Sequence, residues 1–310
     1  MRIFQAYHSI DTTAKGATAA VGNFDGVHAG HMSVIDLARR AMPDAPLGVV
    51  TFEPHPREYF APETPPFRLM SRAARANRLE KVGVELLYEL NFDADLASLT
   101  PLEFARDVLC DGLGLAHVVV GADFCFGKGR AGTADDLVAL GRELGFGVTI
   151  APLVAADAQV VSSTAIRRAL SAGDTRAAKQ MLGHWHRIEG PVITGEQRGR
   201  ELGYPTANMS IDRLHQPAFG VYAVLVDVLK GPHKGSYHGV ASLGVRPMFG
   251  ENTANLETFV FDFKGDLYGT PLSVALIEHL RGEEKFDSLE ALIKQMDADS
   301  AQARAILAAL

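Results

Sequence analysis

Apolar residues along the first half of the chain alternate between short continuous runs and longer stretches with helical spacing. Short, wholly apolar runs are typical of strands buried on both faces of a parallel sheet. We predict such strands at residues 18–21, 47–52, 85–90, 117–121 and 148–151, with amphipathic helices at residues 32–41, 71–83, 101–113, 133–144 and 175–182. This alternation predicts a mostly parallel, Rossmann-like α/β sheet with helices on both sides.

The pattern changes after residue 183. Gly, Pro and Asn residues separate strand-like segments at residues 220–229, 236–243, 256–263 and 272–280, and only residues 288–310 return to helical spacing. Consecutive short strands followed by a terminal helix suggest a small barrel. We therefore predict two domains. Residues 1–183 form the α/β domain, and residues 184–310 form a mainly antiparallel β-barrel with a C-terminal helix.

Composition narrows the class of protein. Hydrophobic residues make up 47% of the 310 residues and charged residues 22%, as in soluble globular proteins with two cores. The net charge of −7 argues against nucleic acid as a partner, because general nucleic-acid binding needs a basic face. Cys110 and Cys125 are too few for a disulfide framework and predict buried thiols in a reducing compartment. No stretch is apolar enough for a membrane span or a leader, so we expect a cytoplasmic protein. Weak self-association stays open.

The first candidate site follows the strand at residues 18–21. A polar, glycine-containing turn leads from this strand into a helix that begins with two histidines, and a helix start favours bound phosphate. Either histidine alone could be a capping or surface residue, but the combination favours a nucleotide site. Its residues are Gly22, Asn23, Phe24, Asp25, Gly26, His28, Gly30 and His31, with the two glycines at 26 and 30 allowing a tight turn and close ligand approach.

Two more loops should lie beside this turn, because ligands of open α/β sheets bind beyond the carboxyl ends of the strands. Pro-His-Pro after the strand at residues 47–52 presents Arg57, although it could be only a rigid loop. The strand at residues 117–121 is followed by a flexible, glycine-rich basic loop, which could simply be solvated. Its position favours substrate binding by Asp123, Phe124, Lys128 and Arg130.

Hydroxyl side chains precede the next helix. Ser163 or Thr164 can cap this helix, so that hydroxyls and backbone donors face an anion, and Arg167 follows one turn later. The alternative is an ordinary capped surface helix. The candidate contacts are Ser162, Ser163, Thr164 and Arg167.

The second half carries one further constellation. Glycines allow the backbone to approach phosphates, and the Thr206 hydroxyl and the Asn208 amide oxygen are hard ligands that suit Mg²⁺. Taken alone, this segment could be a simple turn. Glu257 lies between apolar neighbours in a predicted strand, where an edge salt bridge is the structural alternative. The segment contributes Gly199, Gly203, Pro205, Thr206 and Asn208.

Together these residues resemble the bacterial bifunctional riboflavin kinase/FAD synthetases over essentially the whole chain. The histidine segment resembles the His-x-Gly-His motif of nucleotidyltransferases, and residues 121–127 and 162–167 resemble the Gly-x-Asp-Phe-x-Phe-Gly and Ser-Ser-Thr-x-x-Arg segments of that family. Residues 203–208 resemble the Gly-x-Pro-Thr-Ala-Asn signature of riboflavin kinases, and Arg246, Glu257 and Arg281 follow in the order of the family. Two positions depart from it: Phe259 replaces a common His, and Met248 a usual Thr.

The resemblance implies an enzyme that phosphorylates riboflavin to FMN in the barrel and adenylylates FMN to FAD in the α/β domain, with ATP as co-substrate. It implies that Glu257 is the general base of the kinase, with Mg²⁺ near Thr206 and Asn208. His28 and His31 would stabilise charge on the phosphates during adenylylation. The flavin and ATP contacts would include Arg57, Arg246 and Arg281. Two alternatives stay open: a single-activity adenylyltransferase acting on another phosphate ester, and a non-catalytic flavin- or RNA-binding barrel.

Overall fold

The protein is described by a computed structural model that covers residues 1–8, 10–156, 159–194, 203–248 and 251–310. It forms two compact units. The first comprises Met1–Pro65 and Arg75–Val161, and the second comprises Pro66–Ala74 and Ser162–Leu310. The domain border at residue 183 stays a prediction; Gly183 itself ends a helix of the second unit in the left-handed conformation, with φ 75°.

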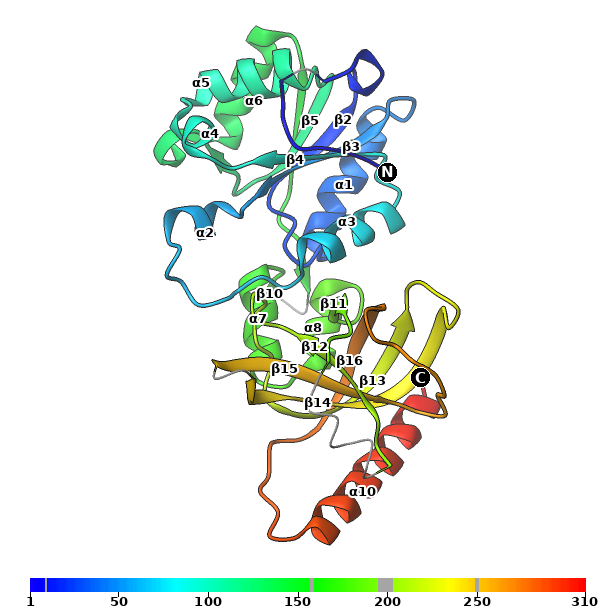
Figure 1. The fold of residues 1–310 in the computed structure, drawn as a ribbon. Helices are drawn as coiled ribbons and strands as arrows, with labels where there is room; N and C mark the ends of the chain where they lie inside the picture. Colours follow the sequence, from blue (N-terminus) through cyan, green and yellow to red (C-terminus); the bar gives the residue numbers. More distant parts are fainter. Residues whose placement is uncertain (9, 157–158, 195–202, 249–250) are drawn as a thin grey trace. The chain divides into compact units, whose positions relative to one another are not determined.

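A six-stranded, wholly parallel sheet forms the centre of the first unit, which confirms the predicted fold (Figure 1). Its order is β1-β4-β3-β2-β5-β8. The chain runs outward from β2 through β3 to β4 and then returns to pair β5 with the other side of β2. The crevice at such a reversal, beyond the carboxyl end of β2, is where open α/β sheets bind ligands. The strands are Arg2–Phe4, Thr18–Val21, Leu47–Glu53, Leu86–Asn91, His117–Gly121 and Gly147–Ala151 in chain order, β1 to β5 and β8.

Helices cover both faces of this sheet. One face packs on a cluster that includes Phe104, Leu109 and Leu137, and α1 packs on strands of the sheet through Val34 and Ile35. The helices are α1 (Ala29–Ala41), α2 (Pro56–Phe60), α3 (Arg72–Lys81), α4 (Ala94–Ser98), α5 (Pro101–Glu103) and α6 (Ala134–Leu144). The helix predicted at residues 101–113 continues beyond α5 as a π-helical segment, Phe104–Gly112. Apolar spacing alone could not distinguish this segment from an α-helix.

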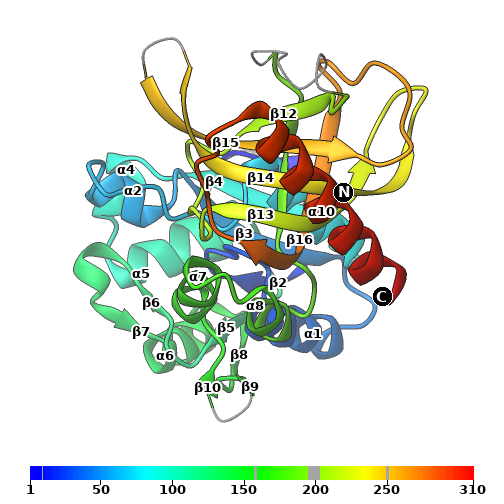
Figure 2. The same cartoon turned by 90° about the horizontal axis from the view of Figure 1, so that it is seen from below.

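An antiparallel sheet forms the centre of the second unit, as predicted, and its strand order is β11-β16-β13-β14-β15-β12. Two of these strands, β11 and β12, are not among the four predicted segments. A bridge between Ile193 and Asn208 nearly closes the barrel. The strands are β11 (Arg187–Pro191), β12 (Thr206–Ser210), β13 (Gly220–Val228), β14 (Gly235–Met248), β15 (Glu251–Val260) and β16 (Pro271–Arg281). The helix α10 (Leu289–Ala308), capped by Ser288, lies across β13 and β14 (Figure 2).

Two helices from the middle of the chain belong to this second unit. They are α7 (Ser163–Ser171) and α8 (Thr175–Leu182), and the Thr175 hydroxyl donates to the carbonyl of Ile277 in β16. The expectation of buried thiols is wrong, because both Cys110 and Cys125 are partly exposed. Cys110 packs at the margin of the first core.

Candidate active sites

The two histidines at the start of α1 form a closed pair. His28 is the N-cap residue, and its Nδ1 accepts the backbone N–H of His31, while Nδ1 of His31 accepts the backbone N–H of His28, each at 3.3 Å. The rings stack with centroids 3.6 Å apart. Because each Nδ1 is an acceptor, a neutral ring carries its proton on Nε2. Desolvation, and then the neighbouring His28, lower the pKa of His31 well below its usual 6.5, so this ring is a neutral N–H donor at pH 7.

The turn before this pair has an unusual backbone. Phe24 and Val27 have φ values of 52° and 41°, which residues other than glycine rarely adopt. Gly26 has φ 91°, a conformation that favours glycine at this position. A Cβ on Gly30 would lie 3.1 Å from the His28 ring, so the space at Gly30 is occupied by that ring rather than left for a ligand. Among the predicted contacts of the turn, Phe24 and Asp25 are buried, and Gly22, Asn23 and Gly30 are partly exposed.

A buried arginine that the sequence analysis did not select holds this turn. Arg75 of α3 is 1% exposed, and its Nη2 donates to Glu53 at 2.8 Å and to Glu89 at 2.7 Å. Its Nη1 donates to the carbonyl of Asn23 at 3.4 Å, and the Thr51 hydroxyl donates to the same carbonyl at 3.1 Å. The ends of β3 and β4 are thereby tied to the turn that leads to the histidines. In the sequence, Arg75 occupies a core-facing position of a predicted helix, and a charged residue at such a position could have indicated a buried ion pair.

Replacing Thr51 by valine is expected to slow the adenylylation that the family resemblance implies three- to tenfold, because a hydrogen bond of about 0.5–1.5 kcal/mol to the Asn23 carbonyl is lost while the shape is kept. The matched control is Thr18→Val. Thr18 is equally buried and donates to the carbonyl of Ala38, at the opposite end of β2. The rate of pyrophosphate release from FMN and ATP measures the effect. Equal losses of rate in both variants would contradict the inference that Thr51 positions the turn through the Asn23 carbonyl.

The basic loop after β5 contains regular structure, and its predicted flexibility stays a prediction. It folds as a small hairpin of β6 (Cys125–Phe126) and β7 (Gly132–Thr133), because Phe126 packs in the core and a Cβ at Gly127 would lie 2.7 Å from Pro101. Phe124 is partly buried and stacks on Phe126 with centroids 5.6 Å apart. The hairpin leaves the side chains of Asp123, Lys128 and Arg130 exposed.

An aromatic cluster lies beyond β3 and β4, and the sequence analysis missed it. Tyr59 and Phe60 of α2 and Phe92 after β4 meet pairwise, with ring centroids 5.1–5.7 Å apart. Tyr59 and Phe60 are 37% and 66% exposed. The segment after β3 was predicted to be extended, but the structure has the short helix α2 there, with His55 as its N-cap. Arg57 is exposed on this helix. Three aromatic rings at the ligand edge of a parallel sheet suit a planar ring system.

The hydroxyl segment begins α7 in the second unit. Ser162, not Ser163 or Thr164 as predicted, is the N-cap, and its Oγ accepts the backbone N–H of Ala165 at 3.2 Å. Serine one position earlier satisfies the same helix donors. Thr164 is exposed, and Ser163 is partly buried. Arg167 Nε donates to the carbonyl of Phe67 at 2.6 Å, and its guanidinium lies over the Phe67 ring.

Strand register brings Thr206, Asn208 and Glu257 together in the barrel. β12 pairs with β15 so that Asn208 lies opposite Glu257 and Thr206 lies opposite Phe259, which places all four side chains on one face of the sheet. Asn208 is 7% exposed, and its Oδ1 accepts a hydrogen bond from Asn255 at 2.8 Å. The side chains of the two motifs therefore meet on one face of the barrel sheet.

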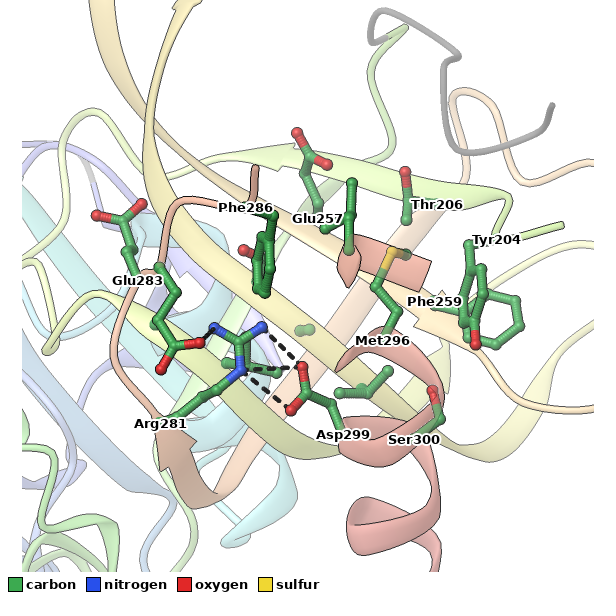
Figure 3. Close-up of a pocket in the computed structure, with 17 residues that line it drawn as sticks. Tyr204, Thr206, Glu257, Phe259, Arg281, Glu283, Phe286, Met296, Asp299 and Ser300 are labelled. Carbon is green, nitrogen blue, oxygen red and sulfur yellow. Dashed lines mark hydrogen bonds and ion pairs between the residues drawn. The ribbon is translucent and has the colours of Figure 1, made fainter. Parts of the chain in front are cut away.

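Two cavities flank Thr206. The first, of about 240 Å³, is lined by Glu257 and by the aromatic side chains of Tyr204, Phe259 and Phe286 (Figure 3). The second, of about 340 Å³, is lined by Pro205, Asn208, Lys264 and Gly265 among others. Thr206 is the one described residue that lines both. A hydroxyl between two cavities is placed to contact two substrates at once.

Arg281 lies in the wall of the first cavity and is paired. Its Nε and Nη2 donate to the carboxylate of Asp299 on α10, the latter at 2.8 Å (Figure 3). Its Nη1 donates to the carbonyl of Gly282. Asp299 is 4% exposed. The arginine predicted to bind a ligand is therefore engaged by a residue that the sequence analysis did not select.

The remaining predicted contacts are less informative. Gly203, with φ 82°, and Pro205 are exposed just before β12. Gly199 lies outside the described residues. Arg246 lies on β14, and its side chain is likewise outside the described part of the structure. No group of three or more His, Cys, Asp or Glu side chains in the described parts of the chain could hold a metal ion. The oxygens of Thr206, Asn208 and Glu257 share one face and are the hard donors that Mg²⁺ takes, together with water and substrate phosphates.

Comparison with known proteins agrees with this division of motifs. The family model of FAD synthetase matches residues 10–165, and the family model of riboflavin kinase matches residues 182–307. A bifunctional riboflavin kinase/FMN adenylyltransferase of Pseudomonas fluorescens is 42% identical, with 99% of this chain and 98% of that protein covered. The protein of the same name from Haemophilus influenzae is 36% identical, with 98% of this chain and 99% of that protein covered. The kinase match to the barrel removes the alternative of a non-catalytic barrel.

A solved structure also matches the whole chain. It is named a macrolide-efflux protein from Streptococcus pneumoniae, is 33% identical, covers 98% of both chains and has a TM-score of 0.84. Among the helices of the described residues, none has the length and apolar character needed to cross a membrane. With an FAD synthetase region, a riboflavin kinase region and relatives that match over nearly their full lengths, the chain belongs to the family of bifunctional riboflavin kinase/FMN adenylyltransferases.

Proposed function

We propose that riboflavin occupies the cavity lined by Glu257 and that ATP occupies the cavity lined by Asn208, with its γ-phosphate at Thr206. The observation that carries this proposal is the position of Thr206 in the walls of both cavities. Three aromatic side chains in the first cavity suit the flavin ring, whereas Lys264 and a neighbouring glycine in the second suit phosphates.

In this arrangement Glu257 is the general base. It takes the proton of the ribityl 5′-hydroxyl while that oxygen forms a bond to the γ-phosphorus of ATP and the bond to ADP breaks. The face shared by Glu257 and Thr206 supports this role, because the base and the phosphate contact lie on paired strands. Thr206 and Asn208 are proposed to hold Mg²⁺, which would neutralise charge on the phosphates.

The adenylyl step is assigned to the turn and helix start of the first unit. The FMN phosphate attacks the α-phosphorus of a second ATP, and pyrophosphate leaves. The Nε2–H groups of His28 and His31 donate to the phosphate oxygens where charge develops. The rings of Tyr59, Phe60 and Phe92 are proposed to support the flavin. Contacts to ATP in this unit are proposed, on the strength of their motifs, for Arg57, Lys128 and Arg130. The motif also makes Ser162, Ser163, Thr164 and Arg167, at the start of α7 in the second unit, candidates for phosphate binding.

The two cavities can be assigned by Michaelis constants. We expect Phe286→Ala to raise KM for riboflavin about tenfold with little change in KM for ATP, because a ring contact is lost. We expect Lys264→Gln to do the reverse, because a charge-assisted phosphate contact is lost. Lys234→Gln, outside both cavities, is the control. ADP release with riboflavin as acceptor is the measurement, and a rise of both constants in either variant would overturn the assignment.

A further inference from the structure

The first cavity has a strongly acidic wall. Its described lining residues include four carboxylates, those of Glu257, Glu283, Glu284 and Asp299, and a single cation, Arg281. The carboxylates come from β15, from the segment after β16 and from α10, so they surround the cavity rather than form one exposed run (Figure 3). A ligand in this cavity therefore meets negative charge from several sides.

The one cation of this wall is already neutralised. Arg281 donates three hydrogen bonds to Asp299, whose side chain is 5% exposed, and its Nη1 lies 3.9 Å from Glu284. Gln295, also on α10, donates to the same aspartate at 2.9 Å. A two-pronged guanidinium–carboxylate pair is strong and directional, so Arg281 is poorly available to a second anion. Burial of Asp299 strengthens the pairing, because water does not compete for the carboxylate.

We propose that Asp299 is a specificity-determining residue of the kinase site: by pairing Arg281, it engages the single cation of the described lining, so that the cavity favours neutral riboflavin over its phosphate ester. The inference rests on the proposed assignment of this cavity to the flavin. Substrate and product share the same ring and differ by a phosphate that carries close to two negative charges. Ring contacts hold both equally, and the carboxylates act against the product alone.

This discrimination has a use in a chain with two activities. FMN made in the barrel is the substrate of the adenylyl step, which is assigned to the other unit. A cavity that repels the phosphate ester shortens the stay of FMN at the kinase site and limits inhibition of riboflavin phosphorylation by its own product. Product release is a common slow step of enzymes, so such repulsion raises turnover.

The test is inhibition of the kinase step by added FMN. The kinase step releases ADP and the adenylyl step releases pyrophosphate, so the initial rate of ADP release reports the kinase alone in the full-length chain. We expect Asp299→Asn to lower the inhibition constant of FMN against riboflavin three- to tenfold, with a smaller change in KM for riboflavin. The amide keeps one acceptor for Arg281 and removes one negative charge. Glu284→Gln, a milder change at an exposed residue, should act in the same direction by about twofold.

Asp262→Asn is the matched control. Asp262 accepts two hydrogen bonds from Arg304, which lies on α10 as Asp299 does, and neither residue lines the cavity. It should leave both constants unchanged. If Asp299 only braced α10, Asp299→Asn would weaken riboflavin and FMN together, and their ratio would stay constant. That result, or a weaker relative binding of FMN in the Asp299 and Glu284 variants, overturns the proposal. If Asp299→Asn changes neither constant, the proposal is overturned as well, whereas the assignment of the cavity to the flavin is tested separately by Phe286→Ala.

Discussion

Replacing Glu257 by glutamine is expected to slow riboflavin phosphorylation by roughly 10²- to 10⁴-fold, the usual contribution of a positioned general base. Glutamine keeps the shape and one hydrogen-bond acceptor but cannot take a proton at neutral pH. Riboflavin and ATP should bind almost as before, because the aromatic wall of the first cavity and the Lys264 wall of the second are untouched. Single-turnover formation of FMN measures the loss directly.

The competing explanation is that Glu257 only supports the sheet. Its position between Asn208 and Ser242 on neighbouring strands would also allow that role. A supporting residue predicts a lower melting temperature and weaker riboflavin binding, with turnover of the bound substrate preserved. Glu278→Gln is the matched control, since Glu278 is a barrel carboxylate paired with Arg176 outside both cavities. Turnover that survives in Glu257→Gln would remove Glu257 from the mechanism.

Features set by local pattern could be predicted from the sequence. Continuous apolar runs at residues 18–21 and 117–121 coincide with β2 and β5, because such runs are typical of strands buried on both faces of a parallel sheet. Three ligand loops follow the strands β2, β3 and β5, because all carboxyl ends of a parallel sheet lie at one edge. Helix α1 begins at Ala29 rather than at residue 32, because two histidines supply a capping box that apolar spacing does not reveal.

Features set by pairing between distant residues could not be predicted. The register that places Asn208 opposite Glu257 is decided by the whole barrel. The engagement of Arg281 by Asp299 depends on where α10 packs, and the contacts of Arg75 depend on the ends of β3 and β4. The cluster of Tyr59, Phe60 and Phe92 joins two segments whose ring contacts leave no periodic signal. Resemblance to a family supplied roles for the motifs, but not for these supporting residues.

Loss of both imidazoles at the start of α1 is expected to abolish most FAD formation while FMN still accumulates. Removing one preorganised hydrogen-bond donor from developing charge typically costs about 2.7–4 kcal/mol, or roughly 10² to 10³ in rate. His28 and His31 each carry such a donor on Nε2, because each Nδ1 accepts a backbone N–H. The kinase residues lie in the second unit, so ADP release from riboflavin and ATP should stay near that of the unchanged protein.

The difficulty is that His28 also caps α1, and its loss alone could disturb the turn. His28→Asn separates the two roles, because asparagine is among the best N-cap residues but has no imidazole N–H. His28→Ala removes both the cap, worth about 1 kcal/mol, and the donor. If the imidazole donates to the phosphates, both variants should lose 10²- to 10³-fold in pyrophosphate release from FMN and ATP, with Asn rescuing only the melting temperature. If His28 merely caps the helix, Asn should rescue the rate as well. A double variant, His28→Asn with His31→Ala, that still forms FAD at a near-normal rate would refute the adenylyl role of the pair.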